Sequence, residues 1–242
     1  MPKLKEKPVS STVATNGEVK VKVPKLFRID LGCGPNKKRK DEGERDDWKG
    51  TDSIAFPGVD YVFDLAEPVY EYRRREIQVT NEDGSLSCEQ TYLERVLVGY
   101  KPWPFKDNSV DQIHSSHVAE HLDSVERVHY MNEIFRILKV GAQAQIICPH
   151  WASCRSLGDP THRFAPLGEF WAYYLLQSWR DTNAPHTDAR HWPLGFNCDF
   201  DATWGYGLHP EVQLKNADYQ QFAVSFYKES ISDIAFTVTK RG

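Results

Sequence analysis

A short apolar run that ends in a glycine loop constrains the fold of this chain more than any other feature. Residues 26–31 read Leu-Phe-Arg-Ile-Asp-Leu, which is typical of a buried strand, and residues 32–36 follow with two glycines and a proline. Because glycine has no Cβ, a loop of this kind lets the backbone approach a ligand closely. The pattern predicts a first strand whose carboxyl end faces a binding site.

Two further strand candidates also end near an aspartate. Trp48 to Ile54 is predicted as a second strand with Asp52 near its end, and Val59 to Leu65 as a third with Asp64 near its end. A carboxylate at the end of the second strand can accept both hydroxyl hydrogens of a ribose. One at the end of the third can accept from an adenine amino group. The order of these features therefore predicts a nucleoside pocket at the carboxyl edge of a sheet.

The rest of the chain alternates between strand and helix patterns. Apolar residues recur at intervals of three and four after Asp123 or Ser124, which predicts a helix to about Leu138 that is stopped by Gly141. The other predicted elements are strands at Ser109–His114, Ala142–Cys148, Phe200–Leu208 and Ile234–Thr239, and helices at Gly168–Trp179 and Tyr219–Tyr227. This alternation predicts an α/β fold of the Rossmann-like, doubly wound type: a mostly parallel seven-stranded sheet with helices on both faces.

Two segments depart from this rhythm. Residues 68–104 contain an Asp-Gly pair between alternating runs, which predicts a β-hairpin insert between the third and fourth strands. Residues 1–24 are rich in Lys, Ser, Thr and Val and poor in bulky apolar side chains, so we expect a disordered tail there. The expected organisation is that tail followed by one domain over residues 25–242.

Composition excludes several classes of protein. The chain has 242 residues and a formal net charge of −4, which argues against a general polyanion binder. It shows no apolar run long enough for a membrane span and no apolar core of a signal peptide near its first residue. Its five cysteines are scattered without a CxxC pair, so we expect free thiols, a reducing cytoplasm and no cysteine zinc site.

Over residues 26–151 the chain resembles the class I S-adenosylmethionine-dependent methyltransferases, in the branch with small-molecule and glycan acceptors. The matching segments begin with residues 29–34, 50–52 and 62–65 and continue with residues 103–111, 116–122 and 133–141. The resemblance implies S-adenosylmethionine as the cofactor. It implies these cofactor-binding residues: Asp30, Gly32, Cys33, Gly34, Asp52, Ser53, Asp64, Leu65, Ser116 and His117.

A dinucleotide is the main rival for such a loop. That fingerprint needs a third glycine, so that a helix N-terminus can approach a pyrophosphate, and Lys37 occupies the third position here. S-adenosylmethionine has no phosphate and does not need that helix end. The loop therefore favours the methyl donor.

Histidines supply the candidates for acid–base chemistry. Methyl transfer mainly requires alignment, but an oxygen acceptor can need a base, and histidine suits that role at neutral pH. His150 and His162 are the predicted catalytic residues on the acceptor side, and His117 is a third candidate already assigned to the cofactor. The simpler alternative is that residues 159–162 form a hydrogen-bonded turn and that His121 packs or caps its helix.

No metal is expected from sequence. A site built from the following residues matches no standard ligand spacing: His150, Asp159, His162, His186 and His191.

The leading hypothesis is an enzyme that methylates an oxygen or nitrogen of a small molecule or glycan. Nucleic acid ranks second as an acceptor, because residues 115–118 lack the run typical of exocyclic-amine methylation and Cys148-Pro149 reverses the cytosine-type pair. A protein acceptor, or a non-catalytic cofactor-binding module, is also compatible with these motifs. The identity of the acceptor and the oligomeric state stay open.

Overall fold

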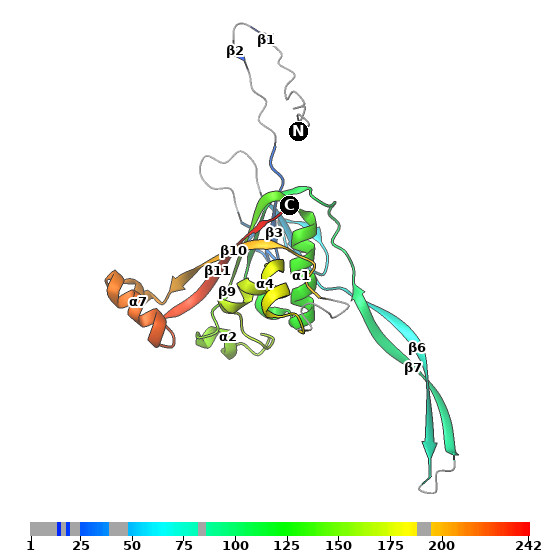
Figure 1. The fold of residues 1–242 in the computed structure, drawn as a ribbon. Coiled ribbons are helices and arrows are strands. Elements are labelled where there is room, and N and C mark those ends of the chain that lie inside the picture. Colours follow the sequence, from blue (N-terminus) through cyan, green and yellow to red (C-terminus); the bar gives the residue numbers. More distant parts are fainter. Residues whose placement is uncertain (1–13, 16–17, 20–24, 39–47, 82–85, 188–194) are drawn as a thin grey trace, which may run out of the picture.

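The computed structural model describes residues 14–15, 18–19, 25–38, 48–81, 86–187 and 195–242. Its centre is a seven-stranded sheet with the order β10-β11-β9-β8-β3-β4-β5 (Figure 1). In chain order these strands are β3 (Arg28–Leu31), β4 (Trp48–Asp52), β5 (Val59–Val62), β8 (Val110–Ser116), β9 (Leu138–Pro149), β10 (Phe200–Leu208) and β11 (Ile231–Lys240). The predicted α/β fold and its seven strands are confirmed.

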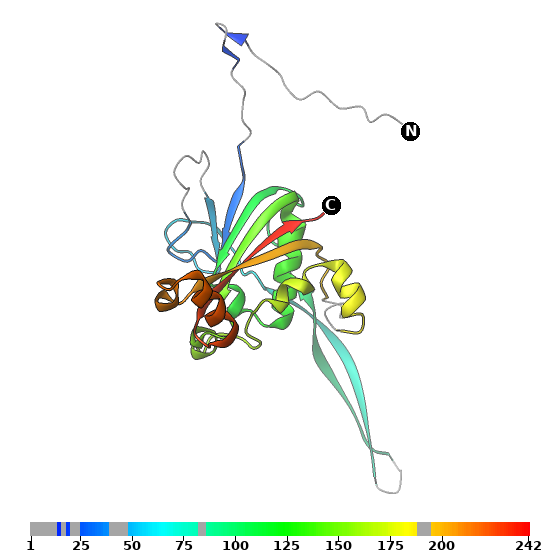
Figure 2. The ribbon, with the colours of Figure 1, turned by 60° about the vertical axis from the view of Figure 1, so that its left-hand side comes forward.

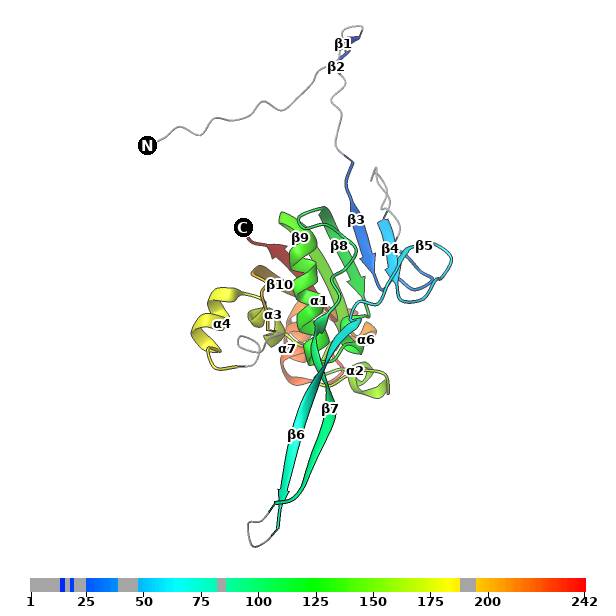
Figure 3. The ribbon, with the colours of Figure 1, turned by 90° about the vertical axis from the view of Figure 1, so that its right-hand side faces the viewer.

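The sheet is mixed in direction. Neighbouring strands from β5 to β9 all pair in parallel, whereas β11 is antiparallel to both β9 and β10. The carboxyl ends of the parallel strands meet at one edge. Figure 3 shows α2 (Cys154–Gly158), α6 (Pro210–Gln213) and the base of the hairpin formed by β6 (Pro68–Thr80) and β7 (Leu86–Tyr100) near that edge. The binding site predicted from the strand ends belongs there.

Among the described residues, the helices are α1 (Ser124–Ile137), α2 (Cys154–Gly158), α3 (Phe170–Tyr174), α4 (Gln177–Asn183), α6 (Pro210–Gln213) and α7 (Ala217–Phe226), with the 3-10 turn η1 (Ala119–His121). Within the part of the chain that the structure describes, no helix lies between β3 and β5. Because residues 39–47 lie outside the described residues, the expectation of helices on both faces stays a prediction for this side of the sheet.

Helix α1 shows how local sequence and packing combine. Asp123 accepts hydrogen bonds from the backbone N–H groups of Val125 and Glu126, and the Glu126 carboxylate accepts one from the N–H of Asp123 in return. Its buried face carries Met131 and Ile134, which pack on the core formed by the sheet. The helix ends at Ile137 and β9 begins at Leu138, so Gly141, with φ +78, lies inside the strand instead of stopping the helix.

The sequence predicts one continuous helix at Gly168–Trp179, and this prediction is wrong. The segment is divided into α3 and α4, because tertiary contacts take the carbonyls between them. The N–H of Phe200 donates to the carbonyl of Leu175 at 3.0 Å, and the Arg180 guanidinium donates to the carbonyl of Tyr174 at 2.6 Å. Packing against the start of β10 therefore overrides the helical periodicity of the sequence.

The predicted insert is a two-stranded hairpin, β6 (Pro68–Thr80) and β7 (Leu86–Tyr100), separate from the main sheet. Figures 1 and 2 show it reaching far out from the body of the molecule. In the region expected to be a tail, the described residues form two short paired strands, β1 (Ala14–Thr15) and β2 (Glu18–Val19). The other residues of that region lie outside the described ones, so the tail stays a prediction.

Candidate functional site

The glycine loop after β3 has the backbone that its sequence predicts. Gly32 and Gly34 have φ values of +60 and +53, a region that strains any residue with a Cβ. A Cβ on Gly32 would lie 2.4 Å from Cγ2 of Val118, whereas one on Gly34 would meet no atom within 4 Å. Gly32 thus lets the loop pack against the segment after β8, and Gly34 leaves space beside the backbone.

Asp30 lies at the end of β3 and is almost fully buried. Its Oδ2 accepts from the backbone N–H of Lys38 at 2.6 Å, and its Oδ1 is 2.8 Å from Nδ1 of His114. Both carboxylate oxygens therefore hold parts of the protein in place. Each keeps a second lone pair, so the predicted contact with the methionine part of the cofactor stays a prediction.

Asp52 joins the end of β4 to the glycine loop. Its Oδ2 accepts from the N–H of Gly34 at 2.9 Å and its Oδ1 from the N–H of Ile54 at 2.9 Å. The N–H of Phe63 donates to its carbonyl at 3.0 Å, which places the end of β5 alongside. The structure therefore brings the ends of β3, β4 and β5 to one edge, as the sequence predicts.

The remaining predicted cofactor residues differ in exposure. Asp64 is exposed and its Oδ1 accepts from the N–H of Ala66 at 2.9 Å, and Ser53 is also exposed. Leu65 is buried, and its carbonyl accepts from the indole N–H of Trp103 at 3.0 Å. Ser116 is the last residue of β8 and is partly buried.

Cys33 reports the electrostatics of this loop. Burial, with the negative charges of Asp30 and Asp52, raises the pKa of its thiol to about 11. A site with this concentration of negative charge suits a cationic ligand. With the space at Gly34 and the Asp52 carboxylate beside it, the loop fits S-adenosylmethionine, whose sulfonium and amino groups are positive.

His117 directly follows the end of β8 and lines a cavity that we call the second cavity. It has φ +57, and its N–H donates to the carbonyl of Ile147 at 2.8 Å. Its Nδ1 is 3.1 Å from Oε1 of Glu120, and this hydrogen bond raises the pKa of His117. The cavity has a volume of about 530 Å³ and is lined by His117, Glu120, His121, Pro149, Arg155, Gly158, Asp159, Pro160 and His162.

His162 lies in a hydrogen-bonded turn, as the simpler alternative for residues 159–162 predicts. Its N–H donates to the carbonyl of Asp159 at 3.1 Å, and the Asp159 carboxylate accepts from the N–H of Thr161 at 2.8 Å. The turn nevertheless directs His162 into the same cavity as His121 and His117. Among the described residues, His186 is not part of that lining, and His191 lies outside the described residues.

His150 follows β9 and is 2% exposed. Its Nδ1 accepts from the N–H of Ala152 at 3.3 Å, so its Nε2 carries the proton and donates to Oε1 of Glu169 at 3.1 Å. The Tyr206 hydroxyl donates to the same oxygen at 2.7 Å. Both ring nitrogens of His150 therefore have protein partners, and the group held in place is Glu169.

Glu169 is a candidate functional residue that sequence reasoning missed. Burial opposes ionisation of its carboxyl, but hydrogen bonds from its own backbone and from Tyr206, together with His150, lower its pKa. Its partners are distant in sequence: His150 follows β9 and Tyr206 lies on β10. A carboxylate beside aromatic residues in the predicted helix was the only available signal.

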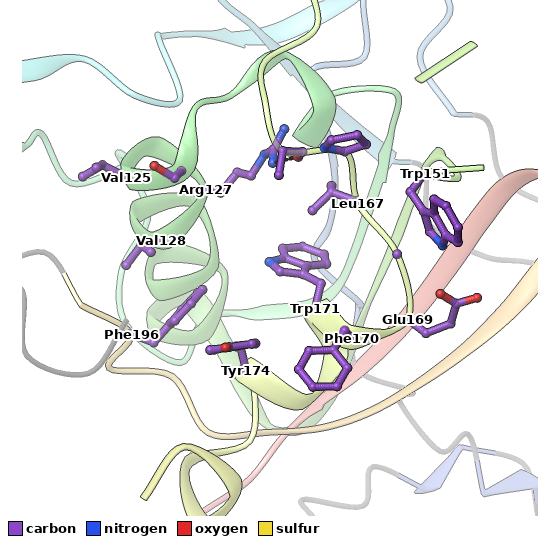
Figure 4. A pocket seen from close by; sticks show the side chains of 14 residues that line it. Val125, Arg127, Val128, Trp151, Leu167, Glu169, Phe170, Trp171, Tyr174 and Phe196 are labelled. Carbon is purple, nitrogen blue, oxygen red and sulfur yellow. Dashed lines mark hydrogen bonds between the residues drawn. The ribbon is translucent and has the colours of Figure 1, made fainter. Parts of the chain in front are cut away.

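Glu169 lines the largest cavity described for this molecule, with a volume of about 660 Å³. Figure 4 shows Trp151 and Glu169 on one side of this cavity and Val125 and Val128 of α1 on the opposite side. The cavity is lined by Ser124, Val125, Arg127, Val128, Trp151, Ala165, Pro166, Leu167, Gly168, Glu169, Phe170, Trp171, Tyr174 and Phe196. Most of this lining is aromatic or aliphatic, with Arg127 and Glu169 as its charged members.

Comparison with known proteins agrees with these observations. Residues 61–146 match a family model described as a methyltransferase domain. This match confirms the prediction of a methyltransferase enzyme, and S-adenosylmethionine, the predicted cofactor, is named in the description of a similar solved structure. Comparison with curated protein sequences gives no match.

Two similar solved structures are also methyltransferases by their descriptions. One is an S-adenosylmethionine-dependent methyltransferase from Archaeoglobus fulgidus, with 14% identity, a TM-score of 0.48 and coverage of 89% of this chain and 86% of that one. The other is geranyl diphosphate C-methyltransferase from Streptomyces coelicolor A3(2), with 13% identity, a TM-score of 0.40 and coverage of 90% and 72%.

Proposed function

We propose that this methyltransferase moves a methyl group from S-adenosylmethionine to an oxygen or nitrogen of a small molecule or glycan. The observation that carries the proposal is the aromatic cavity beside the carboxyl end of β9. A volume of about 660 Å³, an apolar lining and few charged groups are typical of small-molecule sites. The faces of Trp151 and Trp171 suit a flat or sugar ring.

In this proposal the cofactor lies at the ends of β3 and β4. Asp52 accepts hydrogen bonds from the ribose hydroxyls, and the space beside Gly34 takes the amino-acid tail. Asp64, which follows the next strand, β5, is assigned to the adenine amine. The bound cofactor supplies an electrophilic methyl group on its sulfonium, and the protein contributes alignment of the acceptor with that methyl.

The histidines take different roles in the proposal. His150 is a positioning residue, because its Nε2–H fixes the carboxylate of Glu169 at the edge of the aromatic cavity. Glu169 is the group there that can accept a proton from an acceptor hydroxyl. His117 and His162 face the second cavity and stay candidates for contact with the acceptor.

No helix among the described residues is long and apolar enough to cross a membrane. The described cysteines, Cys33, Cys148, Cys154 and Cys198, are free thiols. A reducing compartment such as the cytoplasm, the predicted location, is compatible with them.

The test is to incubate the protein with isotope-labelled S-adenosylmethionine and a metabolite extract, and to follow the label by mass spectrometry. We expect label on a small-molecule or glycan fraction, and less label with Asp52→Ala when the cofactor concentration is below saturation. Label confined to nucleic acid or protein would favour those acceptors instead. Cofactor binding without transfer to any fraction would favour a non-catalytic module.

Calorimetry tests the cofactor assignment separately. Asp52→Ala removes charge-assisted hydrogen bonds, so we expect S-adenosylmethionine to bind about 2 kcal/mol more weakly. Asp201→Ala is the matched control, because its carboxylate lies on β10 and is 69% exposed. Equal affinities of the two folded variants would contradict the assignment of Asp52.

A further inference from the structure

Three donor groups converge in the second cavity. A carboxylate oxygen of Glu120, a ring nitrogen of His121 and a ring nitrogen of His162 all lie within 4.8 Å of one another. The first two come from η1 after β8, and the third comes from the loop after α2. Segments separated by about forty residues therefore bring these groups together, with the two imidazole rings 4.8 Å apart between centroids.

Hydrogen bonds fix the imidazole rings of His121 and His162 so that Nε2 of each ring carries a lone pair. The Nδ1–H of His162 donates to the carbonyl of Ser156 at 3.2 Å, which leaves its Nε2 with a lone pair. The Thr161 hydroxyl donates to Asp159 at 2.7 Å, so it accepts from Nδ1–H of His121 at 3.2 Å. His121 therefore also keeps a lone pair on Nε2. Such second partners are what orient metal-binding histidines and set their tautomer.

Glu120 gives an independent indication that this cavity binds a ligand. The residue is 6% exposed, and its Oε1 pairs with His117. Its Oε2 is buried and has no hydrogen-bond partner. An unsatisfied buried carboxylate oxygen is costly unless a cation or donor compensates it.

The backbone around Glu120 is held firmly. The Arg127 guanidinium donates to the carbonyl of Ala119 at 2.8 Å and to that of Arg163 at 3.1 Å. The N–H of Arg163 donates to the carbonyl of Glu120 at 2.8 Å, which ties η1 to the loop that carries His162. The donor set is therefore positioned by contacts that do not depend on a bound ion.

The surrounding charges also suit a cation. The Asp159 carboxylate lies 3.7 Å from Nε2 of His162 and adds negative charge. Arg155, the basic side chain in the lining, is paired with Asp233 at 3.0 Å, which compensates its charge.

We propose that Glu120, His121 and His162 bind one divalent first-row transition-metal cation, such as Zn²⁺ or Mn²⁺. Two imidazoles and one carboxylate form a nitrogen–oxygen donor set that suits such ions better than it suits Ca²⁺ or Mg²⁺. Ligation at about 2.1 Å requires the donors to approach one another by about an ångström. Three protein ligands leave open positions toward the cavity.

The open positions give the site a role that rests on the proposed function. They face the cavity at the ends of β8 and β9, next to the strand ends assigned to the cofactor. A polar oxygen or nitrogen of the acceptor that reaches the second cavity would be held there, close to the strand ends assigned to the cofactor. Binding of the ion itself does not depend on that role.

Titration calorimetry of chelator-treated protein with MnCl₂ and ZnCl₂ tests the site directly. We expect one equivalent to bind, and affinity at least about 10-fold weaker in His121→Ala and in His162→Ala. His186→Ala is the matched control, because His186 lies outside the cavity lining. Unchanged affinity in both cluster variants, or no binding by the wild type, would overturn the proposal.

A second measurement guards against loss of the fold. With Co²⁺ as the probe, wild-type protein should show visible ligand-field bands that Glu120→Gln and His162→Ala alter, while S-adenosylmethionine affinity is retained in both. Metal binding without any methyl transfer would refute the proposed function and leave this site intact. Identical Co²⁺ spectra in all variants would refute the site.

Discussion

The two glycines of the loop after β3 allow a paired prediction, because they share a backbone conformation and differ in their surroundings. Gly32→Ala and Gly34→Ala both place a Cβ at positive φ, which costs about 1 to 2 kcal/mol in each. Gly32→Ala in addition forces a methyl within 2.4 Å of Val118 Cγ2. Overpacking of this kind costs about 1 to 3 kcal/mol.

The expected losses of unfolding free energy are therefore about 2 to 5 kcal/mol for Gly32→Ala and about 1 to 2 kcal/mol for Gly34→Ala. Urea unfolding followed by circular dichroism measures both. Adding Val118→Ala to Gly32→Ala should recover part of the difference, since it removes the clashing methyl groups. A double-mutant cycle isolates that coupling.

Cofactor affinity should follow the opposite order. A methyl on Gly34 meets no protein atom within 4 Å, so it enters the space assigned to the ligand. We therefore expect folded Gly34→Ala to bind S-adenosylmethionine more weakly than folded Gly32→Ala does, although Gly34→Ala loses less unfolding free energy. Equal destabilisation by the two alanines, or a clash that Val118→Ala does not relieve, would refute the reasoning.

Three other variants probe separate features. Glu133→Ala should lower the unfolding free energy by about 3 kcal/mol in urea titrations, because the buried carboxylate accepts from Arg136 at 2.6 Å and from the N–H of Trp103 at 2.6 Å. Cys33 should react with iodoacetamide about 100-fold more slowly at pH 8 than a thiol with the ordinary pKa of 9, and its reaction rate should increase as the pH rises toward 11. Asp52→Asn should increase the reaction rate of Cys33, which peptide mapping measures. His150→Ala should spare cofactor binding in calorimetry and lower turnover, and unchanged turnover would make His150 purely structural.

Much of the sheet could be predicted from the sequence, and so could the meeting of the strand ends that carry the predicted cofactor residues. The reason is that these signals are local: an apolar run followed by Gly32 and Gly34, or by Asp52, predicts a strand and its end from neighbouring residues alone. The hairpin was predictable for the same reason, since an Asp-Gly pair between alternating runs specifies a turn.

The missed features depend on partners distant in sequence. The break between α3 and α4 follows from Arg180 and from the start of β10, which no helical periodicity reveals. His121 was expected to pack or cap, but its ring meets His162 across the loop after α2. The pairing of His150 with Glu169 likewise joins segments that only the folded sheet brings together.

The position of β11 has a consequence for how this molecule can be cut or assembled. Residues 231–240 are the last strand along the chain, yet they lie between β9 and β10 inside the sheet. Removing them would not trim an edge; it would leave β10 without its pairing partner and open one side of β9 to solvent. Because β11 follows both of its neighbours in the chain and β10 pairs with it alone, β10 can join the sheet only after residues 231–240 have been synthesised.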